Sequence, residues 1–403
     1  MYISSSIPTP FSRDNAMKKK QLVFIGPKAQ KTVTRMARVL KYRGGYETVL
    51  VCFSKVNEEF VKNTYDKIIY LELDFSPSPR NISRLLKKLT GKEARTFFKK
   101  IDALNPYITQ IHGPSIISLL FFLLMKKKPK IFWLGDIWHH SEKKISFRKG
   151  TGRMQYVNYL IEKFIFKRAD GIINKSGEGS LDVLKSKIKG PVLDFLPYCL
   201  DEWIVPPKKK KIDKKKEIHI AYAGMSWDKW DGHAPFEEMV RKIIEQGIHL
   251  HFYPSTIKKE TKSMLENLSK KNKFLHFYSR QDRDKIKKII SRYDYGIHLD
   301  FCDSSVNSKW LEVAISSKVF VYIEAGLPIF LNKQFKNLTN IVERNKMGLG
   351  ITYKDLGKLR EIISKYKPPS VEDIKNAQKN LKMSKQIHRV EEFYDKIHAL
   401  SKG

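Results

Sequence analysis

The stretch that decides the fold is residues 316–332, SSKVFVYIEAGLPIFLN, which indicates a helix followed directly by a buried strand. Ser316 or Ser317 can cap the first helical turn. Gly326 can adopt the left-handed conformation after the last turn, and Pro328 prevents the helix from continuing. The apolar residues that follow Pro328 predict a short strand. A helix between two such signals is typical of the wall of a ligand site.

The predicted helix has two distinct sides. The side expected to face the core carries Val319, Phe320 and Ile323. A second side, which is free to line a cleft, carries Lys318, Tyr322 and Ala325.

The charges on this helix oppose the helix dipole. Lys318 lies at the positive start and Glu324 lies near the negative end. A phosphate bound at the free amides of the first turn would compensate the unfavourable Lys318 position. The alternative is an ordinary amphipathic helix on which both charges are solvated, and the residues alone favour neither.

Size and charge limit the classes of protein and partner. A chain of 403 residues is long enough for two domains, each with its own core, and a hydrophobic content of 41% indicates a folded protein. The formal charge of +35, from 77 Lys and Arg against 42 Asp and Glu, attracts nucleic acid, anionic lipid and phosphorylated substrates. Lysine runs are more often solvated faces than binding sites, so the charge does not choose among these partners.

The cysteines and the apolar segments predict a cytoplasmic protein. Cys52, Cys199 and Cys302 are too few and too widely spaced for a disulfide framework or a paired metal motif. Residues 1–19 lack the apolar core of a signal peptide and are expected to form a disordered lead. The apolar run 115–125 is too short to span a bilayer and predicts a buried helix.

Strands and helices alternate along the chain in two blocks. The first block has predicted strands at 21–26, 46–53, 67–73, 106–112, 129–134, 171–174 and 192–196. The second block has predicted strands at 218–224, 249–253, 274–278, 295–300 and 329–331. Strands separated by helices favour a parallel sheet covered on both faces, so the fold class is α/β with two Rossmann-like domains.

These blocks set the predicted domain boundaries. The expected units are a first domain at 20–205, a lysine-rich linker at 206–217, a second domain at 218–375 and a C-terminal helical segment at 376–403.

Ligands of open α/β sheets bind beyond the carboxyl ends of the strands, so residues directly after strands are the first candidates. Gly26 follows the first strand and would let its backbone approach a ligand, although a tight turn explains it equally well. His112 ends a later strand, where a lone histidine is more often structural. No full GxGxxG is present, which argues against a standard dinucleotide dehydrogenase.

Two further strand ends carry polar residues. In WLGDIWHH, Asp136 and His139 could orient hydroxyl groups or exchange a proton, whereas adjacent histidines without spaced partners predict no metal site. In AYAGMSWDKWDG, the amides after Gly224 and the cation Lys229 could hold a diphosphate, and a surface loop is the alternative. Asp300 ends another strand, and its polar loop has no assigned role.

The stretch 316–332 resembles the donor-site segment of GT-B glycosyltransferases, whose members often read P-N-K-L-F-E-Y-L-A-A-G-L-P-V-I. The matching residues are Lys318, Phe320, Tyr322, Gly326, Leu327 and Pro328. In that family a Glu five residues before the Gly holds the ribose hydroxyls, but this chain has Val321 there. Glu324 is three positions later on the helix and cannot be assumed to inherit the role. The segment QIHGPS around His112 also resembles a family region in which a histidine faces the cleft.

The resemblance implies two domains facing a central cleft, the last helix crossing back to the first domain, and transfer of a sugar from a nucleotide-diphosphate donor to a glycan or lipid-linked acceptor. Donor-binding residues would be Gly224, Lys229, Ser317, Lys318, Tyr322 and Glu324, with backbone approach at Gly26 and Gly326. Acceptor-side catalysis would fall to Asp136, His139 or His112. Helix amides and lysines would replace a divalent ion, so neither a metal nor a cofactor is expected.

Two alternatives concern activity and location. Loss of the glutamate at position 321 is compatible with a non-catalytic GT-B-like or polyanion-binding protein. The basic clusters at 126–128 and 143–149 favour peripheral attachment to an anionic membrane, where a lipid-linked acceptor would lie. Specific nucleic-acid binding is not expected, because the sequence has no recognised nucleic-acid module or paired aromatic platform.

Overall fold

The structure is a computed structural model. It describes residues 19–27, 29–52, 55–70, 91–113, 116–125, 129–135, 150–176, 180, 188–207, 217–225, 234–302 and 308–402.

The N-terminal domain is built on a seven-stranded sheet with the order β3-β2-β1-β4-β5-β6-β7, in which all neighbouring strands are parallel. Its strands are β1 (Lys20–Gly26), β2 (Tyr46–Cys52), β3 (Lys67–Tyr70), β4 (Ile108–His112), β5 (Lys130–Leu134), β6 (Gly171–Asn174) and β7 (Val192–Asp194). The described helices are α1 (Lys31–Arg43), α2 (Glu59–Thr64), α4 (Lys92–Ala103), α5 (Ile116–Leu124) and α6 (Gly150–Phe166).

The β1 sequence LVFI explains why this sheet is covered on both faces. Leu22 and Phe24 pack on one face against α1, whereas Val23 and Ile25 pack on the other face with residues of α4, α5 and α6. All four side chains are at most 1% exposed. A continuous apolar run is what a central parallel strand requires, since both of its faces are buried.

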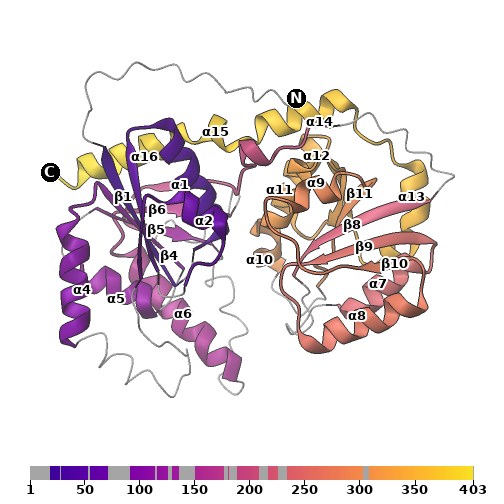
Figure 1. Cartoon of the computed structure of the whole chain (residues 1–403), viewed down its shortest axis with the longest axis horizontal. Helices are drawn as coiled ribbons and strands as arrows, with labels where there is room; N and C mark the ends of the chain where they lie inside the picture. Colours follow the sequence, from indigo (N-terminus) through magenta and orange to yellow (C-terminus); the bar gives the residue numbers. More distant parts are fainter. Residues whose placement is uncertain are drawn as a thin grey trace, which may run out of the picture.

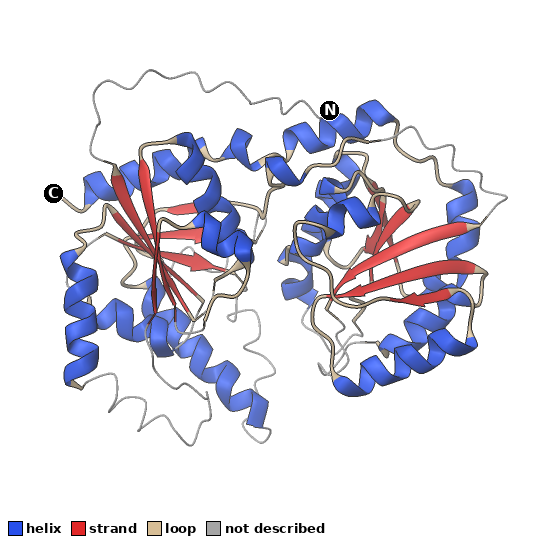
Figure 2. Cartoon of the chain, viewed as in Figure 1, coloured by secondary structure: helices blue, strands red, loops and turns tan. Residues whose placement is uncertain are grey.

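The C-terminal domain repeats this architecture with six parallel strands in the order β10-β9-β8-β11-β12-β13 (Figures 1 and 2). Its strands are β8 (Ile218–Gly224), β9 (Ile248–Pro254), β10 (Leu275–Phe277), β11 (Tyr295–His298), β12 (Ile329–Asn332) and β13 (Gly348–Ile351). Its described helices are α7 (Phe236–Ile244), α8 (Lys259–Lys271), α9 (Ile286–Ile290), α10 (Ser308–Val313), α11 (Ser317–Glu324), α12 (Lys336–Arg344) and α13 (Leu359–Lys365).

The chain then returns to the N-terminal domain through α14 (Val371–Asn380), α15 (Met383–Gln386) and α16 (His388–Leu400), which Figure 1 shows in yellow. In α16, Tyr394 donates a hydrogen bond to Gln110 of β4 at 2.6 Å, and Asp395 forms an ion pair with Lys20 of β1 at 2.8 Å. The last helix therefore packs on the domain that holds the start of the described chain.

The expected fold class is confirmed, since the chain forms two Rossmann-like α/β domains. Strand β13 was not predicted, because its sequence GLGI has two glycines and little β propensity. The apolar run at 115–125 forms the helix α5. Among the described residues, no helix is both long and apolar enough to cross a membrane. Most of the predicted linker, 208–216, lies outside the described residues.

Candidate functional site

Helix α11 begins and ends where the sequence predicts. Ser316 is the N-cap residue, although its side chain makes no capping bond, and Gly326 adopts a left-handed φ of 69°. A Cβ at Gly326 would meet Gln378 of α14 and the backbone of Pro207, so this glycine faces the chain that joins the domains. Val319, Phe320 and Ile323 are buried as expected.

The second side of α11 differs from the prediction, because Tyr322 and Ala325 are buried and do not line a cleft. The hydroxyl of Tyr322 donates to the carbonyl of Ile297 at 2.8 Å and accepts from the amide of Ala223 at 2.9 Å. Tyr322 therefore ties α11 to the two neighbouring strands β8 and β11. In this structure its contacts support the sheet and leave no polar atom for a donor.

Lys318 lies at the point where the strand order of the C-terminal sheet reverses, between β8 and β11. Its ammonium is 3.1 and 3.2 Å from the carboxylate oxygens of Asp300 and 3.4 Å from the carbonyl of Met225. A Cβ at Gly224 would be 2.9 Å from Lys318 Cδ and Cε. Two predicted donor residues, Gly224 and Lys318, are thus brought together at the position where open α/β sheets bind ligands.

Asp300 is the centre of this cluster. It is 5% exposed, and the ring Nε2 of His298, at the end of β11, is 2.9 Å from its carboxylate. Burial would raise the pKa of Asp300, but the ammonium of Lys318 and the ring of His298 outweigh it and hold that pKa well below its usual range. Asp300 is therefore ionised at neutral pH and fixes the Lys318 side chain across Gly224.

The N-terminal sheet has a matching arrangement at its own reversal point, between β1 and β4. Gly26 ends β1 and His112 ends β4, and a Cβ on Gly26 would overlap the imidazole ring of His112. His112 is 2% exposed, so in this structure it packs against the β1–α1 turn. The other predicted residues of this group, Asp136 and His139, lie outside the described residues, as does Lys229.

Glu324 lies at the junction of the domains, and this corrects the expectation that it points toward a donor. Its side chain is fully buried, forms an ion pair with Arg35 of α1 at 3.1 Å and accepts the amide of Leu200 at 2.9 Å. Sequence periodicity could not reveal this role, because Arg35 is far away in the chain and belongs to the other domain.

A group of basic residues also meets at the junction. Arg283, in the loop after β10, forms an ion pair at 3.0 Å with Glu58, which precedes α2. Lys31 lies at the start of α1, where no acidic residue occupies the first turn, and although its side chain reaches solvent it is largely surrounded by residues of the junction. Burial, followed by the repulsion of Arg283 and Arg35, lowers the pKa of Lys31 to about 8. Lys31 was not predicted as a site residue, although its place directly after a βα turn was a signal.

Comparisons of sequence find no match to a protein-family model and no match to a curated protein. Comparisons of structure find similar folds. Sucrose-phosphate synthase from Thermosynechococcus elongatus has a TM-score of 0.64 and 14% identity over 95% of this chain and 100% of its own. The lipopolysaccharide outer core galactosyltransferase WaaB has a TM-score of 0.59 and 11% identity over 95% and 100%.

These proteins have the GT-B fold, in which two Rossmann-like domains are joined as described above. This chain has a GT-B fold. The same fold also matches a putative UDP-N-acetylglucosamine 2-epimerase from Listeria monocytogenes, with a TM-score of 0.57 and 14% identity over 92% of this chain and 95% of that one. At these identities the likeness establishes the GT-B fold and leaves the chemistry to the site.

Proposed function

We propose that this protein is a glycosyltransferase that moves a sugar from a nucleoside-diphosphate donor to an acceptor. The observation that carries the proposal is the position of Lys318 across Gly224, at the reversal point of the C-terminal sheet. A glycine at a strand end lets the backbone approach a diphosphate, and a cation beside it offsets negative charge. Similarity to a galactosyltransferase and to a UDP-sugar epimerase supports a nucleotide sugar as the ligand.

The charge distribution supports the same ligand. Lys318 is paired with Asp300, whereas Arg280 and Arg283 share the single acid Glu58, which is within 4 Å of both, so this group keeps a positive charge in excess. Lys31 adds a further cation at the start of α1. A donor diphosphate between the domains would find positive charge on both sides, which stabilises the charge that grows on the leaving group. We propose that these cations and the helix amides do this without a divalent ion.

The acceptor side belongs to the N-terminal domain in this proposal. Gly26 lets the β1–α1 turn approach the acceptor, and Asp136 or His139 takes the acceptor proton. His112 holds the turn in place through its contact with Gly26. The acceptor is a glycan or a lipid-linked sugar.

A binding experiment tests the donor site first. UDP, GDP and ADP are each added to the full chain, and at least one should raise the melting temperature, because a ligand that binds only the folded state stabilises it. Lys318→Ala should lose most of that rise. Since this change leaves Asp300 without its ammonium partner, the double variant Lys318→Met, Asp300→Asn tests the same loss without a buried lone charge. Lys346→Ala, at an ion pair far along the chain, is the control.

A turnover experiment tests the reaction. Radiolabelled UDP-sugars are incubated with a glycan and lipid-linked acceptor panel, with and without added Mg²⁺ or Mn²⁺. Release of UDP with label in the acceptor, equally with and without added ions, supports the proposal. An epimerised UDP-sugar without release of UDP would show that the reaction is epimerisation and not transfer. Absence of any nucleotide binding would overturn the donor site altogether.

A protein that acts on a lipid-linked acceptor is expected at a membrane surface. The basic clusters at 126–128 and 143–149 lie outside the described residues, but together with the charge of +35 they support attachment to an anionic membrane. Sedimentation with vesicles at low and high salt measures it. Binding to anionic vesicles that is lost in salt supports a membrane-bound acceptor, whereas equal failure on anionic and neutral vesicles at low salt excludes attachment.

A further inference from the structure

Four histidines gather on one face of the C-terminal sheet. His219 lies in β8, His249 and His251 in β9, and His276 in β10. His219 pairs in register with His249, and His276 pairs with His251. Alternate residues of a strand face the same side, so all four rings share one face of the sheet. The opposite face of these strands carries the apolar core.

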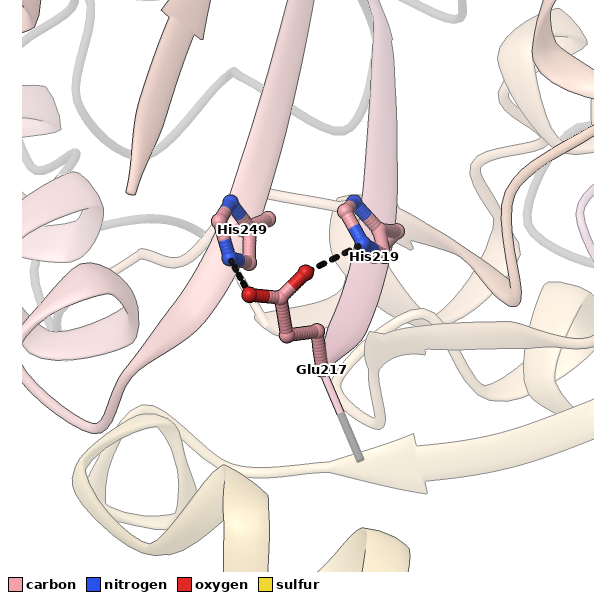
Figure 3. A group of neighbouring side chains, drawn as sticks. All are labelled: Glu217, His219 and His249. Atoms are coloured by element: carbon pink, nitrogen blue, oxygen red, sulfur yellow. Dashed lines mark ion pairs between the residues drawn. The ribbon is translucent and has the colours of Figure 1, made fainter. Parts of the chain in front are cut away.

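Glu217, directly before β8, brings a carboxylate to two of these rings. One carboxylate oxygen is 3.7 Å from His219 Nε2, and the other is 3.7 Å from His249 Nε2 (Figure 3). One atom from each of the three residues lies within 4.8 Å of the other two. We propose that Glu217, His219 and His249 form a binding site for a divalent transition-metal ion such as Zn²⁺.

The separations fit ligands of one ion. Two ligand atoms at about 2.1 Å from Zn²⁺ and at a tetrahedral angle lie about 3.4 Å apart. The two nitrogen–oxygen distances of 3.7 Å are close to this value and longer than a hydrogen bond. His249 Nε2 is inaccessible to solvent and has no hydrogen-bond partner among the described residues, although it points at the Glu217 carboxylate. An ion between the two groups would use that lone pair.

The outer ring nitrogens are held as a metal site requires. His219 Nδ1 is 2.9 Å from His251 Nε2, and His249 Nδ1 is 2.9 Å from His276 Nε2. If each Nδ1–H donates to its neighbour, each Nε2 presents a lone pair to the ion. His251 completes one chain through Nδ1, which is 3.1 Å from the hydroxyl of Tyr278. His251 and His276 are therefore positioning residues, which fix the tautomer of the ligands.

The site lies away from the proposed donor site. His219 and His249 are each the second residue of their strands, whereas Gly224 ends β8 at the opposite edge. Gly224 comes five positions after His219 along β8, which is roughly 17 Å. An ion here would join β8 and β9 to Glu217, the residue directly before β8. We assign it to stabilising the domain, with water completing a four-coordinate sphere.

The test uses the full chain without a histidine tag, after removal of metal with a chelator. Titration calorimetry should show one Zn²⁺ bound per chain, and Co²⁺ should give the intense visible absorption of a four-coordinate site. Mg²⁺ should not compete, because it prefers six oxygen ligands. Zn²⁺ should also raise the melting temperature. Absence of stoichiometric Zn²⁺ binding would overturn the proposal.

Single substitutions then locate the ion. His249→Gln and Glu217→Gln should each remove the Co²⁺ spectrum and weaken Zn²⁺ binding about 100-fold, and His276→Gln should weaken it about 10–100-fold. His388→Gln, which removes an exposed histidine of α16, is the matched control and should bind as the wild type does. Circular dichroism without metal shows that each variant is folded. Wild-type binding in both ligand variants would show that Zn²⁺ binds elsewhere and would also overturn the site.

Discussion

Arg35 of α1 and Glu324 of α11 form a buried ion pair that joins the two domains. The Arg35 side chain is 8% exposed and the Glu324 side chain is fully buried. Glu324 also accepts the amide of Leu200, and its own carbonyl accepts the amide of Val205. One acidic residue thus connects α11, α1 and the chain between the domains.

Breaking this pair should destabilise the protein strongly. Glu324→Gln or Arg35→Met leaves one charge buried without its partner, which costs about 3–5 kcal/mol. The double variant should lose less than the sum of the two single losses, because no lone charge remains. Urea unfolding of the four proteins measures the coupling.

The exposed pair Arg241 and Glu237 on α7 is the control for this experiment. The same double-mutant cycle there should give a coupling below about 1 kcal/mol. If the coupling energies from the two cycles are equal, Arg35 and Glu324 do not form the buried pair. Glu324→Gln should also leave the nucleotide affinity of the folded protein unchanged, because the Glu324 carboxylate binds Arg35 and the amide of Leu200.

The sequence predicted the strands well because parallel buried strands read as apolar runs, such as LVFI in β1 and IAYA in β8. It also placed both ends of α11, because Ser316, Gly326 and Pro328 are local signals. The helical periodicity of the sequence, however, could not show whether the second side of α11 lines a cleft or is also buried. Tyr322 is buried because α11 is enclosed by its own sheet and by α14.

Long-range pairing explains the remaining differences. Asp300 was noticed as a strand end, but its bond to Lys318 depends on two strands and a helix being correctly assembled. His219, His249, His251 and His276 were missed, although their alternation in IHI, IHLH and LHF was a signal once the strands were known. The histidines form a cluster because the register between the strands places them side by side, and a single sequence does not supply that register.

The contact between Gly26 and His112 predicts a cost for adding one methyl group. In Gly26→Ala the new Cβ would overlap a buried imidazole ring, so the protein should lose about 1–3 kcal/mol of stability. Gly357→Ala, where a Cβ would meet nothing within 4 Å, should be close to neutral. Thermal unfolding compares the two variants.

A second substitution shows whether the ring causes the loss. Adding His112→Ala to Gly26→Ala makes room for the new methyl group, so the double variant should be less destabilised than the sum of its single changes. Strict additivity of the two losses would contradict the contact.

Lys31 should make nucleotide binding depend on pH. Its pKa is about 8, lowered by burial and by Arg283 and Arg35. The ammonium is therefore mostly charged at pH 7 and mostly neutral at pH 9, so the affinity for UDP should fall by up to about tenfold across this range. Calorimetry at both pH values measures the change.

Lys31→Arg is the matched variant, because a guanidinium stays charged at pH 9. Its UDP affinity should change much less between the two pH values. Equal falls in the wild type and in Lys31→Arg would show that another group causes the dependence.

Lys287 of α9 is a buried amine at the same junction. It is 1% exposed, its Nζ lies 3.2 Å from the centroid of the Trp203 ring, and Nζ has no hydrogen-bond partner among the described residues. Burial lowers its pKa from 10.5 to about 7, while the carboxylate of Glu324 opposes the shift. Contact of the ammonium with the indole face also favours the charged form.

The depressed pKa of Lys287 makes stability rise with pH. Between pH 7 and 10.5 the unfolded chain holds a proton that the folded chain has lost, so raising the pH across this window favours the folded state. Below pH 7 both states are protonated, and the full cost of burying the charge is present. Lys287→Met removes this cost and should stabilise the protein at pH 6.5 by on the order of 5 kcal/mol. The gain should shrink steadily toward pH 10, as followed by urea unfolding.

Lys288→Met, which replaces the next residue and leaves Lys287 in place, should show no such trend. A gain from Lys287→Met that is the same at pH 6.5 and pH 10 would contradict a titrating amine at this position.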